Sequence, residues 1–354
     1  MSLRVGLTYN LKRKPEEGLP EDFYVEFDDE ETVDAIARAL MRGGCSVTKI
    51  EADEEAYERL RRLRPDIVFN IAEGLRGESR ESHIPAILEM LGIPYTGSGP
   101  LTLALSLDKA LTHQVLEAHG VPSPYFQVFQ SPEERLDGRL RLPAVVKPLS
   151  EGSSKGIRSD SLVRDEKSLR RQVSWVLRTY GQPAIVEEFL PGREFTVGLI
   201  GNEKPMVLPI VEILLDKLPK GASPLYSYEA KWVWDVPERP LDIHRCPAEI
   251  PEGLRKEIEA VALKAFKALR CRDLCRIDIR LDGDGKPRVL EVNPLPGLIP
   301  NPDAHSCLPE AARAAGFEYD QLICTILWQA LKRYGLEGRW RIHDSLLAKV
   351  EGMP

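Results

Sequence analysis

The stretch from residue 275 to residue 297, CRIDIRLDGDGKPRVLEVNPLPG, carries the residue types best suited to hold a metal ion. Its runs RIDIRL and RVLEVN alternate apolar with polar residues, and the DGDGKP between them supplies turn residues, so a β-hairpin is predicted. Glu291 and Asn293 share one face of their strand, and Asp278 on the partner strand can reach it. Two carboxylates and an amide oxygen make a hard oxygen site for Mg²⁺, which keeps phosphates as further ligands. Arg276 projects from the same face, where its guanidinium could stabilise developing oxygen charge.

Two other interpretations of this hairpin are weighed against the metal site. Taken alone, an acidic hairpin is about as often a solvated surface turn. A calcium-binding loop is excluded because, counting from Asp282, the position that needs a sharp-turn glycine holds Pro287 and the position of the bidentate glutamate holds Asn293. The decision between a turn and a metal site rests on the rest of the chain.

Composition narrows the class of protein. The 354 residues suffice for two or three units with cores, and 43% hydrophobic with 29% charged residues is typical of a soluble globular protein. A net charge of -7 argues against a partner held by phosphate neutralisation, such as nucleic acid. No run of about eighteen apolar residues occurs, so no membrane partner is expected, and a cytoplasmic location is predicted.

Strand and helix patterns alternate at the start of the chain. Strands are expected at 4–9, 46–52 and 66–74, and helices at 30–44 and 54–64. This alternation predicts a parallel sheet covered by helices, with ligands at the carboxyl ends of its strands. A helix from 103 to 119, bracketed by the GSGP turn and two prolines, is expected to form a hinge to the next unit.

The remaining chain predicts a phosphate loop and a lid. An apolar strand bearing Lys147 precedes EGSSKG, whose backbone N–H groups and flanking lysines could surround phosphate oxygens, although many such loops are plain connectors. The irregular stretch 216–249 is long enough to be a lid or binding loop. Further elements are expected as helices at 166–180, 254–270, 306–316 and 319–335, two strands within 184–201 and one strand at 205–214.

In this order, VVKP, EGSSKG, VEEFLPGREFTV, YSYEAKW, RIDIRL and LEVNPLPG resemble the D-alanine-D-alanine ligase family of ATP-grasp enzymes over about residues 3–330. The resemblance implies an α/β and α+β ATP-grasp fold with an N-terminal parallel-sheet domain. The expected domains are 1–98 for substrate binding, 99–190 and 191–335 for the two ATP-grasp lobes, and 336–354 as a tail. The resemblance further implies that a substrate carboxylate attacks the γ-phosphate of ATP and that an amine attacks the resulting acyl phosphate.

The resemblance also assigns roles to single residues. It implies nucleotide contacts at Lys109, Lys147, Ser154, Glu187, Glu188, Leu190, Glu194 and Lys231. In this set, residues 187–190 hold adenine, Glu194 holds the ribose, and Lys231 belongs to the lid. It implies Mg²⁺, or Mn²⁺ in its place, on Asp278, Glu291 and Asn293. Catalytic roles fall to Arg276 and the N–H of Gly297 as oxyanion stabilisers, to Ser153 as a support for substrate and lid, and to Lys231.

Departures from the family pattern gather in the amino-acid pockets. The implied substrate residues are Glu26, Glu73, Glu78, Trp232 and Ser306. Glu26 is the nearest candidate for the ammonium-binding glutamate of the first loop, and Glu73 replaces a histidine and could bind an ammonium group instead. Glu78 is taken as the retained acid of the third loop. Trp232 replaces a tyrosine that helps hold the first substrate and its serine, and the segment before Ser306 is longer and includes His305.

Three functional hypotheses follow. The first is a ligase that joins two amino acids, with D-alanine as the family default. The second is a ligase of the same chemistry for another substrate, such as an L-amino acid or a peptide. The third is an inactive nucleotide-binding regulator, which is disfavoured because no metal ligand and no oxyanion arginine is missing. The expected partners are ATP and small amino-acid-like substrates. A homodimer, the substrates' chirality and the role of the tail stay open.

Overall fold

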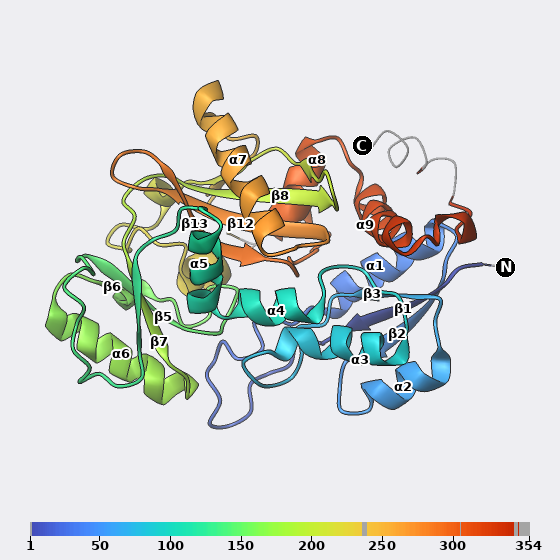
Figure 1. Cartoon of the computed structure of the whole chain (residues 1–354), viewed down its shortest axis with the longest axis horizontal. Helices are drawn as coiled ribbons and strands as arrows, with labels where there is room; N and C mark the ends of the chain where they lie inside the picture. Colours follow the sequence, from blue (N-terminus) through green and yellow to red (C-terminus); the bar gives the residue numbers. More distant parts are fainter. Residues whose placement is uncertain (1, 236–238, 305, 343–345, 347–354) are drawn as a thin grey trace.

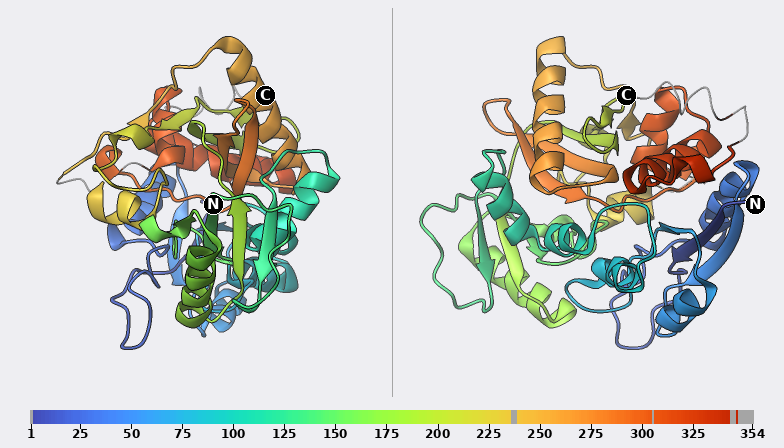
Figure 2. Two further views of the ribbon diagram at one scale, coloured as in Figure 1. Left: turned by 90° about the vertical axis from the view of Figure 1, so that its left-hand side faces the viewer. Right: turned by 45° about the vertical axis from the view of Figure 1, so that its right-hand side comes forward.

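The chain folds around three sheets that meet at its centre. The computed structural model describes residues 2–235, 239–304, 306–342 and 346. Figure 1 shows the N-terminal sheet at one end of the molecule, the sheet covered by α6 at the other, and the largest sheet with α7 above them. The right-hand view in Figure 2 shows the same arrangement.

The N-terminal sheet is parallel, with strand order β2-β1-β3, as the alternating pattern predicted. Its elements are β1 (Arg4–Tyr9), α1 (Glu30–Arg42), β2 (Ser46–Glu51), α2 (Ala56–Leu63), β3 (Ile67–Asn70) and α3 (His83–Leu91). One face packs against α1 and the other against α2 and α3. Loops that could form a site therefore follow the ends of β1 and β3.

The helix expected from 103 to 119 is instead two helices, α4 (Pro100–Leu107) and α5 (Lys109–Ala118). Asp108 separates them because its backbone is extended, with φ -82° and ψ 105°, and its carboxylate accepts from the N–H of Leu111. An aspartate that can cap a new helix competes in this way with continuation of the old one. The break places Lys109 in the first turn of α5.

The middle sheet is antiparallel, with strand order β4-β7-β5-β6. Its elements are β4 (Phe126–Phe129), β5 (Ala144–Pro148), β6 (Leu162–Val163), α6 (Glu166–Tyr180) and β7 (Ala184–Glu188). Asp165 caps α6, whose apolar face covers this sheet. The loop with the EGSSKG sequence joins β5 to β6.

The largest sheet holds the predicted hairpin. Its elements are β8 (Glu194–Gly201), β9 (Met206–Val207), β10 (Val211–Ile213), β11 (His244–Arg245), α7 (Glu252–Ala268), β12 (Asp273–Leu281) and β13 (Pro287–Asn293). The strand order is β11-β10-β8-β12-β13, and β9 pairs with β8. The single strand expected at 205–214 is split into β9 and β10, because Pro209 between them cannot donate to a strand ladder. The hairpin prediction is confirmed by the pairing of β12 with β13.

The closing helices return to the N-terminal unit. Helices α8 (Cys307–Ala314) and α9 (Tyr319–Tyr334) share a core with β1 and α1. In the tail, the indole N–H of Trp340 donates to the carbonyl of Gly43 at 2.9 Å. No helix in the described ranges is both long and apolar enough to span a bilayer. The proposed domain boundaries at 98, 190 and 335 stay predictions.

Candidate active site

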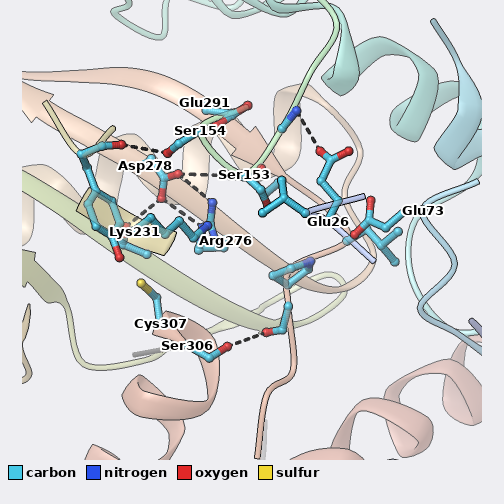
Figure 3. A pocket seen from close by; sticks show the side chains of 18 of the residues that line it. Glu26, Glu73, Ser153, Ser154, Lys231, Arg276, Asp278, Glu291, Ser306 and Cys307 are labelled. Atoms are coloured by element: carbon cyan, nitrogen blue, oxygen red, sulfur yellow. Dashed lines mark hydrogen bonds and ion pairs between the residues drawn. The ribbon is translucent and has the colours of Figure 1, made fainter. Parts of the chain in front are cut away.

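A cavity lies where the three sheets meet, and most of the predicted site residues line it (Figure 3). These are Glu26, Glu73, Lys109, Lys147, Ser153, Ser154, Glu194, Lys231, Trp232, Arg276, Asp278, Glu291, Asn293, Gly297 and Ser306. They come from the N-terminal loops, the α4–α5 region, the phosphate loop, the lid and the hairpin. The fold therefore brings together positions that are scattered over nearly the whole sequence.

The hairpin register explains why the metal-site candidates meet. Asp278 lies opposite Glu291, and Arg276 lies opposite Asn293. The Asp278 carboxylate is held by the guanidinium of Arg276 at 2.9 Å and by the amide of Asn293 at 3.2 Å. Its other oxygen accepts from the hydroxyl of Thr196 on β8 at 2.7 Å. These bonds fix the carboxylate's orientation, as partners behind a metal ligand commonly do.

The donor set of this site fits a hard divalent cation. Asp278, Glu291 and Asn293 offer carboxylate and amide oxygens on one face, which is the chemistry that Mg²⁺ prefers when phosphates complete its shell. Within the described ranges, no group of three or more His, Cys, Asp or Glu side chains is arranged to hold a metal ion. A site of two carboxylates and one amide is compatible with that finding.

Lys109 connects the metal site to the phosphate loop. Its ammonium pairs with Glu291 at 3.0 Å and donates to the carbonyl of Glu151. Burial would lower the pKa of Lys109, but the neighbouring carboxylate of Glu291 outweighs burial and raises it. The side chain therefore stays cationic beside the position where phosphate charge is expected.

Lys147 is held by a buried carboxylate beneath it. Its ammonium lies 2.5 Å from Glu187, which also contacts the imidazole of His113 at 3.1 Å. Burial would raise the pKa of Glu187, but Lys147 and His113 hold it at about 2. The side chain of Glu187 thus positions a cavity lysine. Together with Glu188 and Leu190, Glu187 is absent from the cavity lining, and the adenine contacts of all three stay predictions.

The phosphate loop has the backbone form of an anion-binding turn. Ser153 and Ser154 have φ values of 50° and 61°, in the left-handed region that residues other than glycine seldom adopt. Such departures gather at ligand sites, where successive N–H groups can face an anion. Gly152 donates its N–H to Glu26 at 2.9 Å, and a Cβ at this glycine would lie 2.5 Å from the same carboxylate. Only glycine allows this close approach.

The lid lies against the phosphate loop. It includes a π-helical turn, Glu229–Trp234, that carries Lys231 and Trp232. The indole N–H of Trp232 donates to the carbonyl of Ser153 at 3.0 Å, and the Ser154 hydroxyl donates to the carbonyl of Tyr226 at 2.8 Å. Trp232, which stands where the family has a tyrosine, therefore contacts the backbone carbonyl of Ser153 and not its hydroxyl. Residues 236–238 of the lid lie outside the described residues.

The lid lysine faces other cations. Burial and the nearby guanidinium of Arg276 both lower the pKa of Lys231. An anion placed between these two groups would be attracted by both, as a phosphate or an oxyanion requires. On β8, Glu194 pairs with Arg280 of the neighbouring strand β12 at 3.1 Å and also lines the cavity.

The amino-acid pocket differs from the sequence prediction in its acids. Both oxygens of Glu26 are engaged, one by Arg80 at 2.6 Å and one by the N–H of Gly152, so Glu26 joins the first loop to the phosphate loop. Burial would raise the pKa of Glu26, but Arg80 outweighs it and lowers it. Glu78 lies apart, in a neighbouring cavity with Arg13 and Arg80. The acid of this loop that lines the central cavity is Glu81.

At the far end of the cavity, the Ser306 hydroxyl donates to the carbonyl of Gly297 at 3.1 Å, directly before α8. His305 lies outside the described residues. The sequence analysis did not single out four further lining residues, Lys12, Asp28, Glu81 and Thr196. Only Thr196 carried a usable signal, because strand alternation places its side chain on the same face of β8 as that of Glu194.

Comparison with known proteins assigns the family. The model of the D-ala D-ala ligase C-terminus matches residues 115–328. A D-alanine-D-alanine ligase of Pelotomaculum thermopropionicum is 35% identical over 87% of this chain and 93% of its own length. The chain belongs to the D-alanine-D-alanine ligase family. It is therefore an ATP-dependent carbon–nitrogen ligase of the ATP-grasp fold.

Two further relatives place this ligase within the family. The uncharacterized protein y4sG of Sinorhizobium fredii is 39% identical over 85% of this chain and 88% of its own length. A crystal structure of D-alanine-D-alanine ligase from Bacillus anthracis superposes with a TM-score of 0.70 at 26% identity, covering 95% of this ligase and all of that chain. The family fold thus extends over almost the whole chain.

Proposed function

We propose that this ligase joins two amino acids in the central cavity through an acyl phosphate. The carboxylate of the first substrate attacks the γ-phosphorus of ATP, forming a C–O–P linkage and releasing ADP. The amine of the second substrate then attacks the acyl carbon, so a C–N bond forms, the C–O bond to phosphate breaks, and phosphate and a proton leave. The observation that carries this proposal is the meeting of Asp278, Glu291, Asn293 and Arg276 with three lysines in one cavity.

The proposed roles follow from charge and position. Asp278, Glu291 and Asn293 would hold Mg²⁺, or Mn²⁺ in its place, which supplies neutralisation of phosphate charge when bound. Lys109, Lys147 and Lys231 orient the phosphates. Phosphoryl transfer depends mainly on the positioning of the reacting groups and on neutralisation of the phosphate charge. Arg276 and the N–H of Gly297 stabilise the oxyanion of the amide-forming step. Glu194 binds the ribose, residues 187–190 bind adenine, and Ser306 lies near the second substrate.

The substrate is proposed to differ from the family default. The Pelotomaculum thermopropionicum relative is named for D-alanine. In this chain, however, a carboxylate at Glu73 stands where the family has an imidazole, and Glu26 has both oxygens occupied. A site built on hydrogen bonds changes its specificity by orders of magnitude when one partner is replaced. We therefore expect D-alanine not to be the preferred first substrate, and we place the enzyme in the cytoplasm.

Steady-state ADP release over D- and L-amino acid pairs, with mass spectrometry of the product, tests this function. We expect one pair other than D-alanine with itself to give the highest kcat/KM. D-alanine alone giving about 10⁴ M⁻¹s⁻¹ or more, above every other amino acid, would show that the default substrate is retained. ADP release with none of the pairs would favour the inactive regulator.

A further inference from the structure

Three carboxylates from the N-terminal unit line the cavity, and none of them has a hydrogen-bonded or ion-paired cation among the described residues. Asp28, Glu73 and Glu81 all line the cavity, and Glu81 is only 8% exposed. Among the described residues, none donates a hydrogen bond to these carboxylates and none forms an ion pair with them. Glu81 is buried, and Asp28 and Glu73 are half-buried. Carboxylates removed from water are normally paired, so these three are exceptions that need a cause.

The nearby cations are already committed to other groups. Arg80 is bound by Glu26 at 2.6 Å and by Glu151 at 3.1 Å. Lys109 pairs with Glu291, as described above. Lys12 lies 4.9 Å from the ring centre of Trp232 and acts on Asp28 only through its field. Arg80 and Lys109 therefore act on Glu73 and Glu81 only through their fields, and none of the three acids is in direct contact with a cation among the described residues.

The pKa values of these acids are raised, as expected for carboxylates that lack a cationic partner. Burial raises the pKa of Glu81 to about 8 and that of Asp28 to about 7. Burial, reinforced by Glu81, raises the pKa of Glu73 well above its usual value. A bound organic cation would favour the ionised carboxylates and remove the cost of burying them unpaired.

The acids are spread along the cavity rather than gathered at one point. Glu81 interacts electrostatically with Glu291 and Lys109, at the metal end. Glu73 shares Glu26 and Arg80 with Glu81 as electrostatic neighbours, but its further neighbour is Asp28 and not Glu291 or Lys109. Figure 3 shows Glu73 beside Glu26, apart from Arg276 and Asp278. An amino acid whose carboxylate reacts at the metal end carries its α-ammonium one carbon away. The side chain of the same amino acid can extend farther from the metal end, toward Glu73 and Asp28.

We propose that the first substrate is an amino acid with a cationic side chain. Glu81 binds its α-ammonium, a role that the sequence had given to Glu73, and Glu73 with Asp28 binds the side-chain cation. This inference rests on the proposed ligase function, whose first substrate supplies the carboxylate. It makes Glu73 and Asp28 the residues that determine specificity for the side chain.

The test compares arginine with citrulline, and lysine with 2-aminoheptanoic acid, in both chiral forms. Each pair matches in length and differs in charge. ADP release is measured with a range of second amino acids, and tandem mass spectrometry shows which residue is N-terminal, because the first substrate supplies the carboxylate. We expect the cationic member to be N-terminal and its kcat/KM to exceed that of its neutral partner about tenfold or more, a ratio that one charged contact of about 1.4 kcal/mol provides.

Two variants test the proposed roles of Glu73 and Glu81 separately. Glu73→Gln should reduce the arginine-to-citrulline ratio about tenfold, whereas Glu81→Gln should lower kcat/KM for both substrates and leave the ratio unchanged. Glu117→Gln, on the exposed side of α5, is the matched control and should change neither. Citrulline used as well as arginine by the wild type, or an unchanged ratio in Glu73→Gln, would overturn the inference.

Calorimetric binding keeps the inference separate from the ligase function. Arginine and citrulline are titrated into the wild type and Glu73→Gln with a non-hydrolysable ATP analogue and Mg²⁺. Tighter binding of arginine to the wild type, lost in Glu73→Gln, supports the cation pocket even if no pair releases ADP, a result that would refute only the proposed function. Equal binding of arginine and citrulline refutes the pocket even where turnover is found.

Discussion

Glu291 is the side chain whose loss should separate activity from folding. Glu291→Gln keeps the shape and an oxygen that can accept from Lys109, but it removes a charge that the proposed metal site needs. We expect kcat to fall about 100-fold or more while the variant still folds, with a melting temperature lowered only by the loss of the Lys109 ion pair. Glu257→Gln, in an exposed pair with Lys286, is the control. Near-normal ADP release by Glu291→Gln would remove the metal assignment.

Glu187 gives a prediction about pH. Its folded-state pKa of about 2 lies below the usual value of 4.5, so its ionised form stabilises the fold above about pH 4.5, and this contribution is lost as the pH falls toward 2. Glu187→Gln leaves Lys147 buried without its partner, and it should cost about 3 kcal/mol of unfolding free energy at pH 7.

Urea unfolding of wild type and Glu187→Gln at pH 7, 5, 4 and 3.5 measures this contribution. The difference between the two proteins should shrink below pH 5, while the exposed control Glu117→Gln should differ little from the wild type at any pH. A difference that stays constant with pH would mean that the loss in Glu187→Gln comes from packing and not from the ion pair.

The hairpin residues could be predicted from sequence because strand alternation fixes which side chains share a face. Asp278, Glu291 and Asn293 needed only this local rule. The acids of the amino-acid pocket could not be predicted in the same way. Whether Glu78 or Glu81 reaches the cavity depends on the path of the loop before α3, which local pattern does not fix.

At the scale of elements, the lid should gain protection when ligands bind. It is held to the phosphate loop by few hydrogen bonds, among them that from Trp232 to Ser153. We expect amide exchange in 216–235 and 239–249 to slow when a nucleotide analogue and amino acids are added. Equal exchange with and without these ligands would show that the lid does not open.

Trp232→Phe probes the same lid by removing the indole donor. The variant should exchange faster than the wild type and should show a kcat lowered by about tenfold, since one hydrogen bond that favours the closed lid is lost. Val233→Ala is the control, because Val233 belongs to the same turn and is 46% exposed. Wild-type exchange and kcat in Trp232→Phe would show that the indole does not hold the lid.

The elements themselves were largely predictable where periodicity was strong, as in α1, α6 and the N-terminal strands. The predictions were wrong where one residue overrode the pattern. Asp108 ended a helix whose apolar period continued past it, and Pro209 divided a run that otherwise reads as one strand. The order of strands within the sheets depends on contacts between distant segments, so local pattern did not predict it.

At the scale of the whole molecule, Asp273 joins three distant segments. This fully buried carboxylate accepts from the N–H of Gly97 at 2.8 Å, from Asn202 at 3.0 Å and from Arg333 at 2.7 Å. Asp273→Asn suits the left-handed backbone there, with φ 63°, but leaves Arg333 without its charge partner. We expect a loss of about 3 kcal/mol or more in unfolding free energy.

Denaturant unfolding of Asp273→Asn measures how much unfolding free energy the contacts of Asp273 contribute. Asp284→Asn, in the exposed hairpin turn, is the control. Because Arg333 also donates to the carbonyl of Tyr95, the variant should loosen the contact between α9 and the N-terminal unit first. A variant as stable as the wild type would show that the remaining hydrogen bonds hold the joint without the charge.

The packing of α9 and Trp340 onto α1 has a consequence for synthesis. The apolar surface of α1 is made early, but the helix that covers it is synthesised much later along the chain. At about 5–20 residues per second, that surface stays uncovered for roughly 15–60 s on each nascent chain. The N-terminal unit therefore has to remain soluble as an unfinished intermediate, and chains truncated before α9 should be bound by chaperones or aggregate.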